Sequence, residues 1–421
     1  MNRQDSIFYH IDVNSAFLSW AAVARLQKDP SSIDIRTIPA VIGGDESKRH
    51  GIVLAKSVSA KAFGIQTGES LANARKKCPT LQVFSPDFAT YVTMSNKFME
   101  YLKEVAPLVE QYSIDEAFCN MSGTSLLYGD CVEYAHRLKD SIREKFGFTV
   151  NIGISSNKLL AKMASDFKKP DMVHTLFPDE IADKMWSLPV GELFFVGSAT
   201  RQKLSALGIH TIGDIAKSDR ELLISHFKKH GEVIWNYANG NDVELPTHHS
   251  TANKSFGNSM TIQFDVTDSE TAKTILLSLC ETVGARIRAE HAYIGVVSVN
   301  IVDNEFHSMS KQCTLPSRTD VTEIIYSASC SLFDELWNNS PIRLLGISAS
   351  HATTDDFYQM SLFDEEKNTK LSKLNKAIDS IRGKYGEDSI KRARFIDSEH
   401  KHMSGGLNKE KRTQSGNTNI L

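Results

Sequence analysis

The sequence has few of the residues that mark secreted or membrane proteins. Its 421 residues include only six cysteines, at positions 78, 119, 131, 280, 313 and 330, and no two of them are spaced as CxxC. We therefore expect reduced thiols in a reducing compartment. No apolar run approaches the roughly 20 residues of a membrane helix, and the first residues lack the layout of a secretory signal. These absences predict a cytoplasmic protein without membrane contact.

An excess of positive charge is also missing. The chain has 48 Lys and Arg against 51 Asp and Glu, a net charge of −3, whereas nucleic-acid-binding domains are usually basic. Lysines concentrate in residues 156–170 and 201–230, and residues 245–352 are acidic. Any binding of a polyanion must therefore depend on local basic segments, or partly on backbone amides.

What the sequence does contain is an ordinary globular composition, 41% hydrophobic and 24% charged. Its length predicts about three or four domains, each able to bury a core. Within it, two adjacent acids, Asp115 and Glu116, stand between apolar residues typical of strands. A regular strand would send them to opposite faces, but a hairpin bend lets both emerge at one end of a sheet. Acids held together usually bind a cation, and Mg²⁺ prefers oxygen ligands. A solvated turn is the alternative.

A third acid, Asp12, occupies a similar setting. It ends the apolar strand 8–13 and precedes a helix over 14–22 with Asn14 or Ser15 as N-cap. Open α/β sheets keep their sites at such strand ends, although Asp12 could simply cap the helix. Helices over 87–108 and 130–146 and a strand over 149–155 follow, which predicts an α+β sheet with helices on one face and Asp12 beside Asp115 and Glu116.

Several segments after residue 155 have patterns typical of contact with a polyanion or with a partner protein. Lys158 and Lys162 lie four residues apart on one face of a predicted helix. These lysines either form a solvated face or neutralise a triphosphate. Residues 178–243 are expected to be helical. Their glycine turns have amides that could hold backbone phosphates, or the segment is a plain helical hairpin.

The pattern of residues 254–352 predicts an α+β domain with strands over 260–266, 294–302 and 344–349. In the polar tail, residues 359–364 are typical of a peptide that docks into a groove, a helix is expected over 367–383, and residues 405–421 are expected to be disordered.

Taken together, these motifs resemble the Y-family, or translesion, DNA polymerases, especially polymerase IV-like and UmuC-like bacterial members. The resemblance covers roughly residues 6–350 in order. Its parts are Asp12-Val13-Asn14 with an aromatic at Phe17, Ser113-Ile114-Asp115-Glu116, Gly153-Ile154-Ser155 through Lys169-Pro170, the helix-hairpin-helix-like stretch 196–216, the entry Lys254-Ser255-Phe256-Gly257, and a sliding-clamp-like peptide, Gln359 to Phe363.

The resemblance implies a multidomain α+β fold shaped as a right hand. It implies a catalytic palm at 6–27 and 88–177, small fingers at 28–87, a helical thumb with the helix-hairpin-helix at 178–244, a linker at 245–253, an α+β little finger at 254–352, and a clamp-binding tail at 353–421. It also implies a monomer that works on primer-template DNA and dNTPs and is tethered to the sliding clamp (beta subunit).

The same resemblance assigns roles to residues. Two Mg²⁺ ions are held by Asp12, Asp115, Glu116 and the Val13 carbonyl, and Phe17 is the steric gate against ribonucleotides. Contacts to the incoming dNTP come from Phe17, Lys61 and Lys169. Contacts to DNA are expected from Lys158, Lys162, Gly197, Gly208 and Lys254, and contacts to the clamp from Gln359, Leu362 and Phe363. The implied enzyme has low fidelity and no proofreading exonuclease.

Three positions depart from the family pattern. Val58 stands where a triphosphate-binding Tyr is frequent, Lys61 where Arg is common, and Ala16 where an aromatic is frequent next to the gate. A Lys replaces the bidentate fork of Arg by a point charge. Two other functions remain open on the residues alone. One is a nucleotide cyclase or related metal-dependent transferase, and the other is a catalytically silent DNA-binding scaffold that recruits the clamp.

Overall fold

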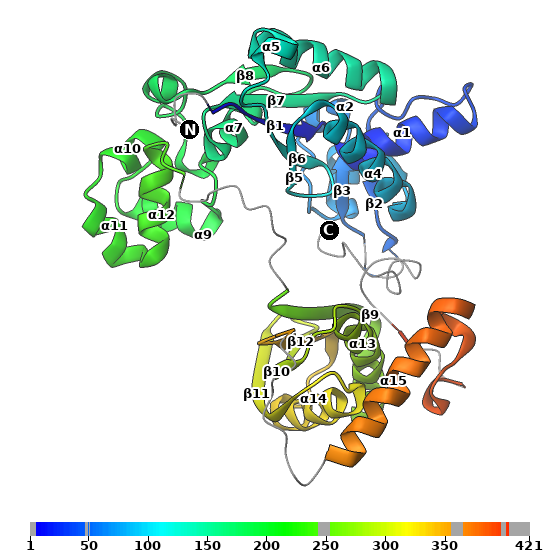
Figure 1. The fold of residues 1–421 in the computed structure, drawn as a ribbon. Coiled ribbons are helices and arrows are strands. Elements are labelled where there is room, and N and C mark those ends of the chain that lie inside the picture. The colour runs from blue at the N-terminus through cyan, green and yellow to red at the C-terminus, as the bar shows by residue number, and fades with distance from the viewer. Residues whose placement is uncertain are drawn as a thin grey trace.

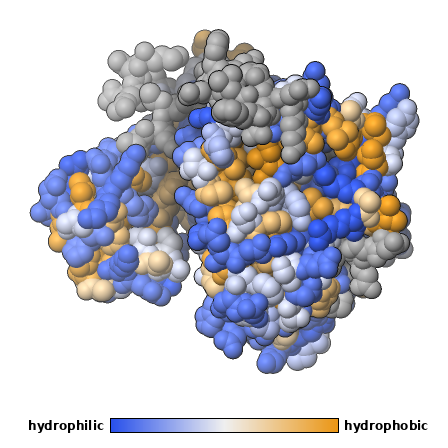
Figure 2. Space-filling model, turned by 90° about the horizontal axis from the view of Figure 1, so that it is seen from below, coloured by the Kyte–Doolittle hydropathy of each residue, from blue (hydrophilic) through white to orange (hydrophobic). Residues whose placement is uncertain are grey.

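The structure of the chain, a computed structural model, describes residues 6–46, 49, 51–242, 253–354, 365–396 and 401–403. Figure 1 shows a central sheet with a helical segment beside it and a second α+β domain below them. No helix in the described ranges has the length and apolar character needed to span a membrane. The face seen from below mixes hydrophilic and hydrophobic residues (Figure 2).

The central sheet has five strands in the order β5-β6-β1-β7-β8. Its middle strand β1 pairs antiparallel with both β6 and β7. All but one of the β1 residues are buried, which is what a strand in the centre of a covered sheet requires. The strands are β1 (Phe8–Val13), β5 (Leu108–Gln111), β6 (Glu116–Asn120), β7 (Val150–Ser155) and the short β8 (Val173–Thr175), which the sequence analysis did not predict.

Helices cover both faces of this sheet, so the expectation that they lie on one face was wrong. Tyr9, Ile11 and Val13 of β1 enter a core with three helices, α1 (Ala16–Lys28), α4 (Phe88–Val105) and α6 (Cys131–Phe146). The alternate residue His10 faces the other way, toward α7 (Lys158–Ser165), where its ring contacts Ser165. Because side chains alternate along a strand, Asp12 shares the α7 face with His10.

A glycine allows α7 to lie directly on the sheet. A Cβ added at Gly153 of β7 would stand 1.9 Å from the Ala161 carbonyl oxygen and 2.4 Å from the Ser165 backbone nitrogen. Both are backbone atoms, which cannot move aside as a flexible side chain can. The N-cap Asn157 begins α7 by accepting a hydrogen bond from the Leu160 backbone N–H. The glycine and the cap together place this helix directly against β7 and β1.

A smaller sheet packs beside α1. Its strands run in the order β3-β2-β4, and β4 is parallel to β2. Apolar runs at 39–42 and 51–55 predict a strand pair, which is confirmed as β2 (Ala40–Gly43) and β3 (Val53–Lys56). Short helices predicted over 59–64 and 70–78 are confirmed as α2 (Val58–Ala62) and α3 (Leu71–Lys77), whereas β4 (Gln82–Phe84) was not predicted.

Residues 178–242 are helical, as predicted, and form one apolar core with α7. The elements are short because glycine turns and capping residues such as Thr211 interrupt them. They are the 3₁₀ helices η3 (Pro178–Glu180) and η4 (Val190–Glu192), and α8 (Ile181–Lys184), α9 (Ser198–Ala206), α10 (Ile212–Lys217), α11 (Arg220–Phe227) and α12 (Lys229–Ala238).

The lower domain is a four-stranded antiparallel sheet in the order β11-β10-β12-β9, with two helices on one face. Three of its strands were predicted, and the sequence also predicts its two helices, over 269–290 and 320–338. The missed strand β11 carries mostly exposed, polar residues and lacks a clear apolar alternation. The elements are β9 (Ser255–Val266), α13 (Ser269–Ala289), β10 (Ile294–Asp303), β11 (Ser308–Thr319), α14 (Thr322–Leu336) and β12 (Ile342–Ser350).

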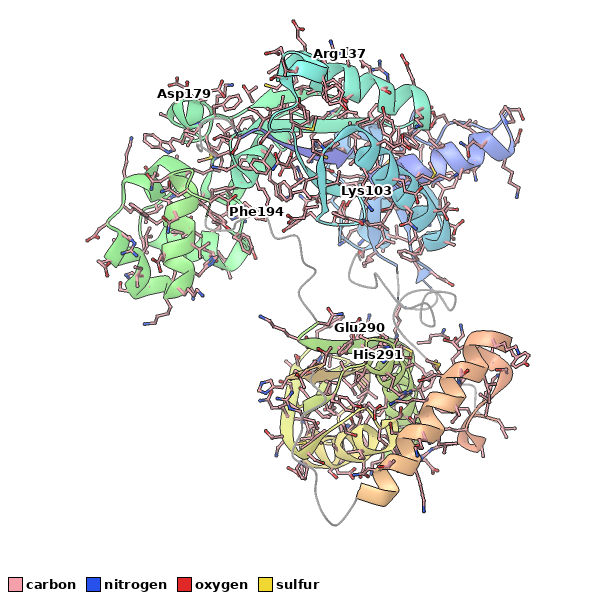
Figure 3. All side chains as sticks on the ribbon, in the orientation of Figure 1. Lys103, Arg137, Asp179, Phe194, Glu290 and His291 are labelled. Carbon is pink, nitrogen blue, oxygen red and sulfur yellow. The ribbon has the colours of Figure 1, made fainter. Side chains whose placement is uncertain are left out.

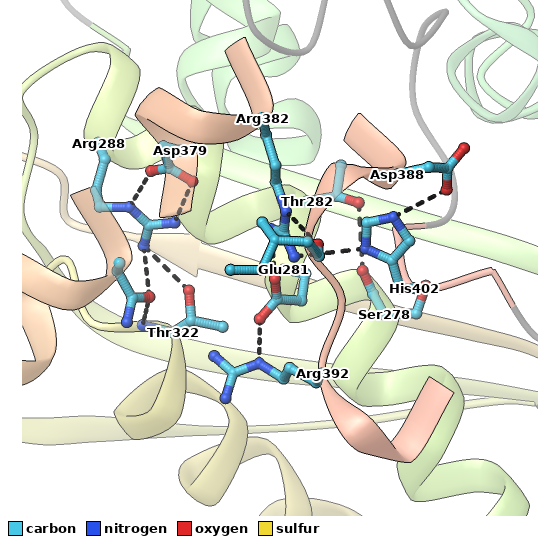
Figure 4. A network of polar contacts seen from close by, with 12 residues as sticks. Ser278, Glu281, Thr282, Arg288, Thr322, Asp379, Arg382, Asp388, Arg392 and His402 are labelled. Carbon is cyan, nitrogen blue, oxygen red and sulfur yellow. Dashed lines mark hydrogen bonds and ion pairs between the residues drawn. The ribbon is translucent and has the colours of Figure 1, made fainter. Parts of the chain in front are cut away.

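Most of the described part of the tail packs against this lower domain. It comprises α15 (Glu365–Tyr385), η5 (Glu387–Ser389) and η6 (Ala393–Phe395). The ionic contacts are drawn in Figure 4: Glu281 of α13 accepts hydrogen bonds from Arg382 and Arg392, and Arg288 of α13 makes a bidentate pair with Asp379. Charged side chains thus face the domain.

One flank of α15 carries exposed apolar residues. Leu374, Ile381 and Tyr385 are exposed, and their spacing of seven and four residues places them on one stripe of a helix. At 3.6 residues per turn this stripe lies about 100° around the helix from Asn375 and Arg382, which are buried where α15 docks.

Candidate active site

The antiparallel register of β1 and β6 brings the three predicted acids together. Asp12 stands directly opposite Glu116, and the Val13 backbone N–H donates to the Asp115 carbonyl oxygen at 3.1 Å. Residues opposite each other in an antiparallel pair share a face, so the carboxyl groups of Asp12 and Glu116 are neighbours. The expected hairpin bend lies between β5 and β6, where the backbone N–H groups of Tyr112 and Ser113 both donate to the Glu116 carbonyl.

Asp115 sits inside that bend. The Ser113 hydroxyl donates to Asp115 Oδ1 at 2.6 Å, and Ser113 Oγ accepts from the Asp115 backbone N–H at 3.3 Å. This local turn frees Asp115 from strand alternation, which is the physical reason why two consecutive acids can serve one site. Three carboxylates from two distant segments of the chain are therefore gathered at one end of the central sheet.

Each outer acid of the group has a lysine partner. Lys169 Nζ contacts Asp12 Oδ2 and lies 2.8 Å from Asp166 Oδ1, and Lys162 Nζ contacts Glu116 Oε2. Lys169 was predicted to contact the incoming triphosphate, and its side chain is about one-third exposed. It therefore lies at the mouth of the carboxylate group.

Lys158 and Lys162 do not form the exposed lysine face that the sequence predicted. Both residues are only 8% exposed. Lys158 Nζ lies 2.8 Å from Glu110 Oε2, and Lys162 is bound to Glu116. Their acidic partners come from β5 and β6, some fifty residues earlier in the chain, so no local pattern announces them. In this arrangement both lysines are internal ion-pair partners, and their contact with DNA stays a prediction.

The pKa values of the three acids diverge. Burial raises the pKa of Asp12 to about 6, although Lys169 opposes the shift, and the charges of Glu116 and Asp115 add to it. Burial also raises the pKa of Asp115. Burial acts in the same direction on Glu116, but the hydrogen bond from His10 and the Lys162 ammonium outweigh it and lower the pKa of Glu116 to about 2. A raised pKa on two of three neighbouring carboxyls is typical of an anionic site that is short of cations.

The donor set suits a hard divalent cation. In the described ranges no three His, Cys, Asp or Glu side chains already form a ready cage, and two of the three carboxyls hold lysine ammonium groups instead. The oxygen donors of Asp12, Asp115, Glu116 and the Val13 carbonyl are nevertheless the ligand type that Mg²⁺ prefers. The Lys169 ammonium is a cation that already contacts Asp12 Oδ2. A metal ion bound to that oxygen would have to displace the ammonium group.

Phe17 follows the site on α1. Its ring stacks on Tyr91 of α4, with centroids 4.5 Å apart and planes at 10°, and meets Phe88 edge-on at 6.0 Å. The turn that connects β1 to α1 passes through Ser15 in the left-handed region, with φ of 49°. Phe17 is therefore held by aromatic packing and is not free to swing.

The other predicted residues lie on the surface of separate elements. Lys61 of α2 is exposed, and so is the nearby Val58. Gly197 is the N-cap of α9, Gly208 adopts φ of 76° in the next turn, and Lys254 is exposed at the start of β9. Gln359, Leu362 and Phe363 lie outside the described residues.

A hollow lies between the helical segment and Lys169, the partner of Asp12. It is lined by Asp166, Lys169 and residues 191–197. Phe194, labelled in Figure 3, connects the helical segment to the acidic hairpin, because its ring meets that of Tyr112 at 6.3 Å and lies 5.3 Å from Lys162 Nζ. The glycine turn at Gly197 and the ammonium group that pairs with Asp12 thus line one concave region.

Sequence reasoning missed three residues around the site. His10 and Ser165 stand behind Glu116, and Tyr91 lies under Phe17. His10 could have been found, because it stands two residues before Asp12 and therefore on the same face of the strand. Ser165 and Tyr91 are brought in by helices distant in sequence.

Comparisons with known proteins agree with this arrangement. The chain matches the models of the impB/mucB/samB family over residues 11–166, of the IMS family HHH motif over 178–209, and of the impB/mucB/samB C-terminal domain over 253–362. It is 47% identical to DNA polymerase IV of Clostridium acetobutylicum, covering 94% of this chain and 99% of that protein. It is 36% identical to DNA polymerase IV of Clostridium kluyveri, covering 93% and 98%, respectively.

A solved structure shares the fold. A Y-family DNA polymerase chimera superposes with a TM-score of 0.70 at 21% sequence identity, covering 83% of this chain and 100% of that chain. The predicted multidomain α+β fold with a helix-hairpin-helix is therefore confirmed. The chain belongs to the impB/mucB/samB family of bacterial Y-family DNA polymerases.

Proposed function

We propose that this chain extends primers on damaged as well as undamaged templates, and that Asp12, Asp115 and Glu116 form its catalytic centre. As a Y-family member it is a DNA-directed DNA polymerase. The observation that supports this location is the β1–β6 register, which sets Asp12 opposite Glu116 with Asp115 in the adjoining bend. Two Mg²⁺ ions bound there, with the Val13 carbonyl as a further ligand, would lower the pKa of the primer 3′-hydroxyl and stabilise the charge of the triphosphate and pyrophosphate.

We assign the elements to the parts of the polymerase hand in the same way. Residues 6–27 and 88–177 form the palm, 28–87 the fingers, 178–244 the thumb, 254–352 the little finger and 353–421 the tail. In this assignment the hollow between palm and thumb receives the primer end. The amides at the start of α9 and the turn at Gly208 hold backbone phosphates, and Lys254 adds a charge from the little finger.

Two lysines would meet the incoming dNTP from opposite sides. Lys169 already lies against Asp12 and Asp166, and its ammonium can neutralise the triphosphate once a metal ion takes over Asp12. Lys61 projects from α2 of the fingers. With Val58 in place of a hydrogen-bonding residue, the fingers hold the triphosphate by charge alone.

The direct test is primer extension by the purified chain. We expect templated addition of dNMPs that requires Mg²⁺ and stops on chelation, on an undamaged template and on one with an abasic site. Extension of undamaged DNA alone would leave a polymerase without the bypass activity, and no templated extension on either would refute the proposal. A silent scaffold would also show no Mg²⁺-dependent nucleotide affinity.

The steric gate gives the first mutational prediction. Phe17→Ala should raise the ratio of kcat/KM for ribonucleotides to that for deoxyribonucleotides by about tenfold or more, because the ring that faces the sugar is removed. The matched control is Phe88→Ala, which removes a neighbouring ring of the same cluster. Single-nucleotide insertion kinetics measure both. If the ratio stays constant, or changes equally in the control, the gate lies elsewhere.

The tail gives the second. Leu362 and Phe363 form an adjacent large apolar pair, and we propose that they, with Gln359, bind the sliding clamp. Replacing both by Ala should abolish stimulation by the clamp and leave distributive synthesis unchanged. The control replaces Leu126 and Leu127, an exposed leucine pair of the palm, by Ala. Clamp-stimulated synthesis that survives in the tail variant would contradict the assignment.

A further inference from the structure

We propose that His10 is a positioning residue that, together with Ser165, holds one oxygen of the Glu116 carboxylate so that the other oxygen is presented to the cation; the inference rests on the proposed metal site. His10 lies in the middle strand of the central sheet and is 0% exposed. Its Nε2 is 3.0 Å from Glu116 Oε2 and its Nδ1 is 2.7 Å from Ser165 Oγ. The imidazole thus joins a catalytic carboxylate on β6 to the last turn of α7.

The acceptor character of the carboxylate sets the direction of this chain of hydrogen bonds. An ionised carboxylate only accepts, so Nε2 carries the proton and donates to Glu116 Oε2. In a neutral imidazole Nδ1 then accepts, and the Ser165 hydroxyl donates to it. The Ser165 hydroxyl also donates to the Lys162 carbonyl oxygen at 2.7 Å, so Nδ1 of a neutral His10 shares the single Ser165 proton with that carbonyl. The bond that holds Glu116 is the one that His10 Nε2 donates, and Ser165 positions the opposite side of the ring.

Two donors converge on the same oxygen of Glu116. Lys162 Nζ contacts Oε2, as does His10 Nε2, and both come from the α7 side of the sheet. In the described part of the chain, the hydrogen bonds that His10 and Lys162 make to the Glu116 carboxylate both end on Oε2. Fixing one oxygen from behind leaves the second as the metal-facing donor, and partners of this kind orient metal-binding groups and raise their affinity.

The packing around His10 makes its ring orientation unique. The Phe118 ring lies 4.7 Å away at 54°, and the strand partner of His10 on the other side is Gly153, at which α7 makes its close approach. A ring held in this way cannot rotate to another partner without moving the helix. The two donors have different roles. The imidazole fixes the orientation of the Glu116 carboxylate, whereas Lys162 supplies positive charge.

The test compares His10→Leu, His10→Gln and Ser165→Ala, with the exposed His136→Gln as control. Two quantities are measured. One is kcat for primer extension, and the other is the dissociation constant of Mn²⁺ from the complex with template, dNTP and a dideoxy-terminated primer, in which no turnover occurs. We expect His10→Leu to weaken Mn²⁺ binding and lower kcat by about 10-fold to 100-fold. His10→Gln, which keeps an N–H donor, should recover most of both, and Ser165→Ala should cause a smaller loss in both.

Unchanged Mn²⁺ affinity in folded His10→Leu, or the same loss in His10→Gln as in His10→Leu, would overturn the positioning role. Thermal unfolding of each variant identifies a protein that does not fold, and in that case Ser165→Ala decides, with unchanged Mn²⁺ affinity as the contrary result. An active Asp115→Asn enzyme would instead refute the proposed catalytic centre itself. The two failures are therefore distinguishable.

Discussion

Replacing Asp115 by Asn should lower kcat for primer extension about 1,000-fold or more, which corresponds to roughly 4 kcal/mol of barrier. Asn has nearly the same shape but lacks the negative charge, and it offers one oxygen in place of two. The Ser113 hydroxyl can still donate to that oxygen, so the bend should persist. The loss would therefore report on charge at the catalytic centre and not on folding.

The measurement is single-turnover extension with saturating dNTP, together with thermal unfolding. The control is Asp179→Asn, an exposed acid at the start of η3, labelled in Figure 3. We expect the control to keep wild-type kcat and the Asp115 variant to keep the wild-type midpoint of unfolding. Comparable activity of Asp115→Asn and wild type would remove Asp115 from the catalytic centre.

A second large effect is expected where the tail docks on the little finger. Glu281 and Arg382 are 4% and 3% exposed and lie 2.7 Å apart, from Glu281 Oε2 to Arg382 Nη1 (Figure 4). Glu281→Leu leaves Arg382 buried without its partner, and breaking a buried pair in this way costs about 3–5 kcal/mol. We expect the tail helix to detach, because its contacts are ionic and do not form an apolar core.

Hydrogen exchange of the α15 amides measures this directly. Exchange in Glu281→Leu should rise by a factor of about 100 or more, the equivalent of 3 kcal/mol in local opening. The double variant Glu281→Leu with Arg382→Met replaces the pair by apolar groups of similar size and should recover much of the protection. Slow exchange in the single variant would show that the ion pair does not hold the helix.

Local pattern was sufficient for much of the central sheet. The apolar run 8–13 and its terminal acid predict β1, and the strand at 150–155 and the helices that flank it follow from the same periodicities. The gathering of Asp12 with Asp115 and Glu116 could be predicted because adjacent acids in a bend and an acid at a strand end both point to one edge of a sheet. The resemblance to a known family supplied the gate and the dNTP lysines, which remain proposals.

Other features depended on contacts that no local pattern encodes. Lys158 and Lys162 were expected on a solvated face, but Glu110 and Glu116 neutralise them inside the protein. The position of α7 on the second face depends on Gly153, whose role is visible only when the helix lies against it. The docking of α15 likewise depends on distant partners, because Asp379 and Arg382 pair with Arg288 and Glu281 of α13.

The ionic attachment of α15 shows that the family model and the folded domain end at different residues. Similarity to the family models stops at residue 362, yet the partners of Glu281 and Arg288 come from residues 379–392. A polypeptide cut after residue 362 would retain every recognised segment and still leave two buried charges of α13 uncompensated. The cooperative folding unit of the lower domain therefore extends beyond the segment that the family model matches, and truncations guided by that model would remove part of its interior.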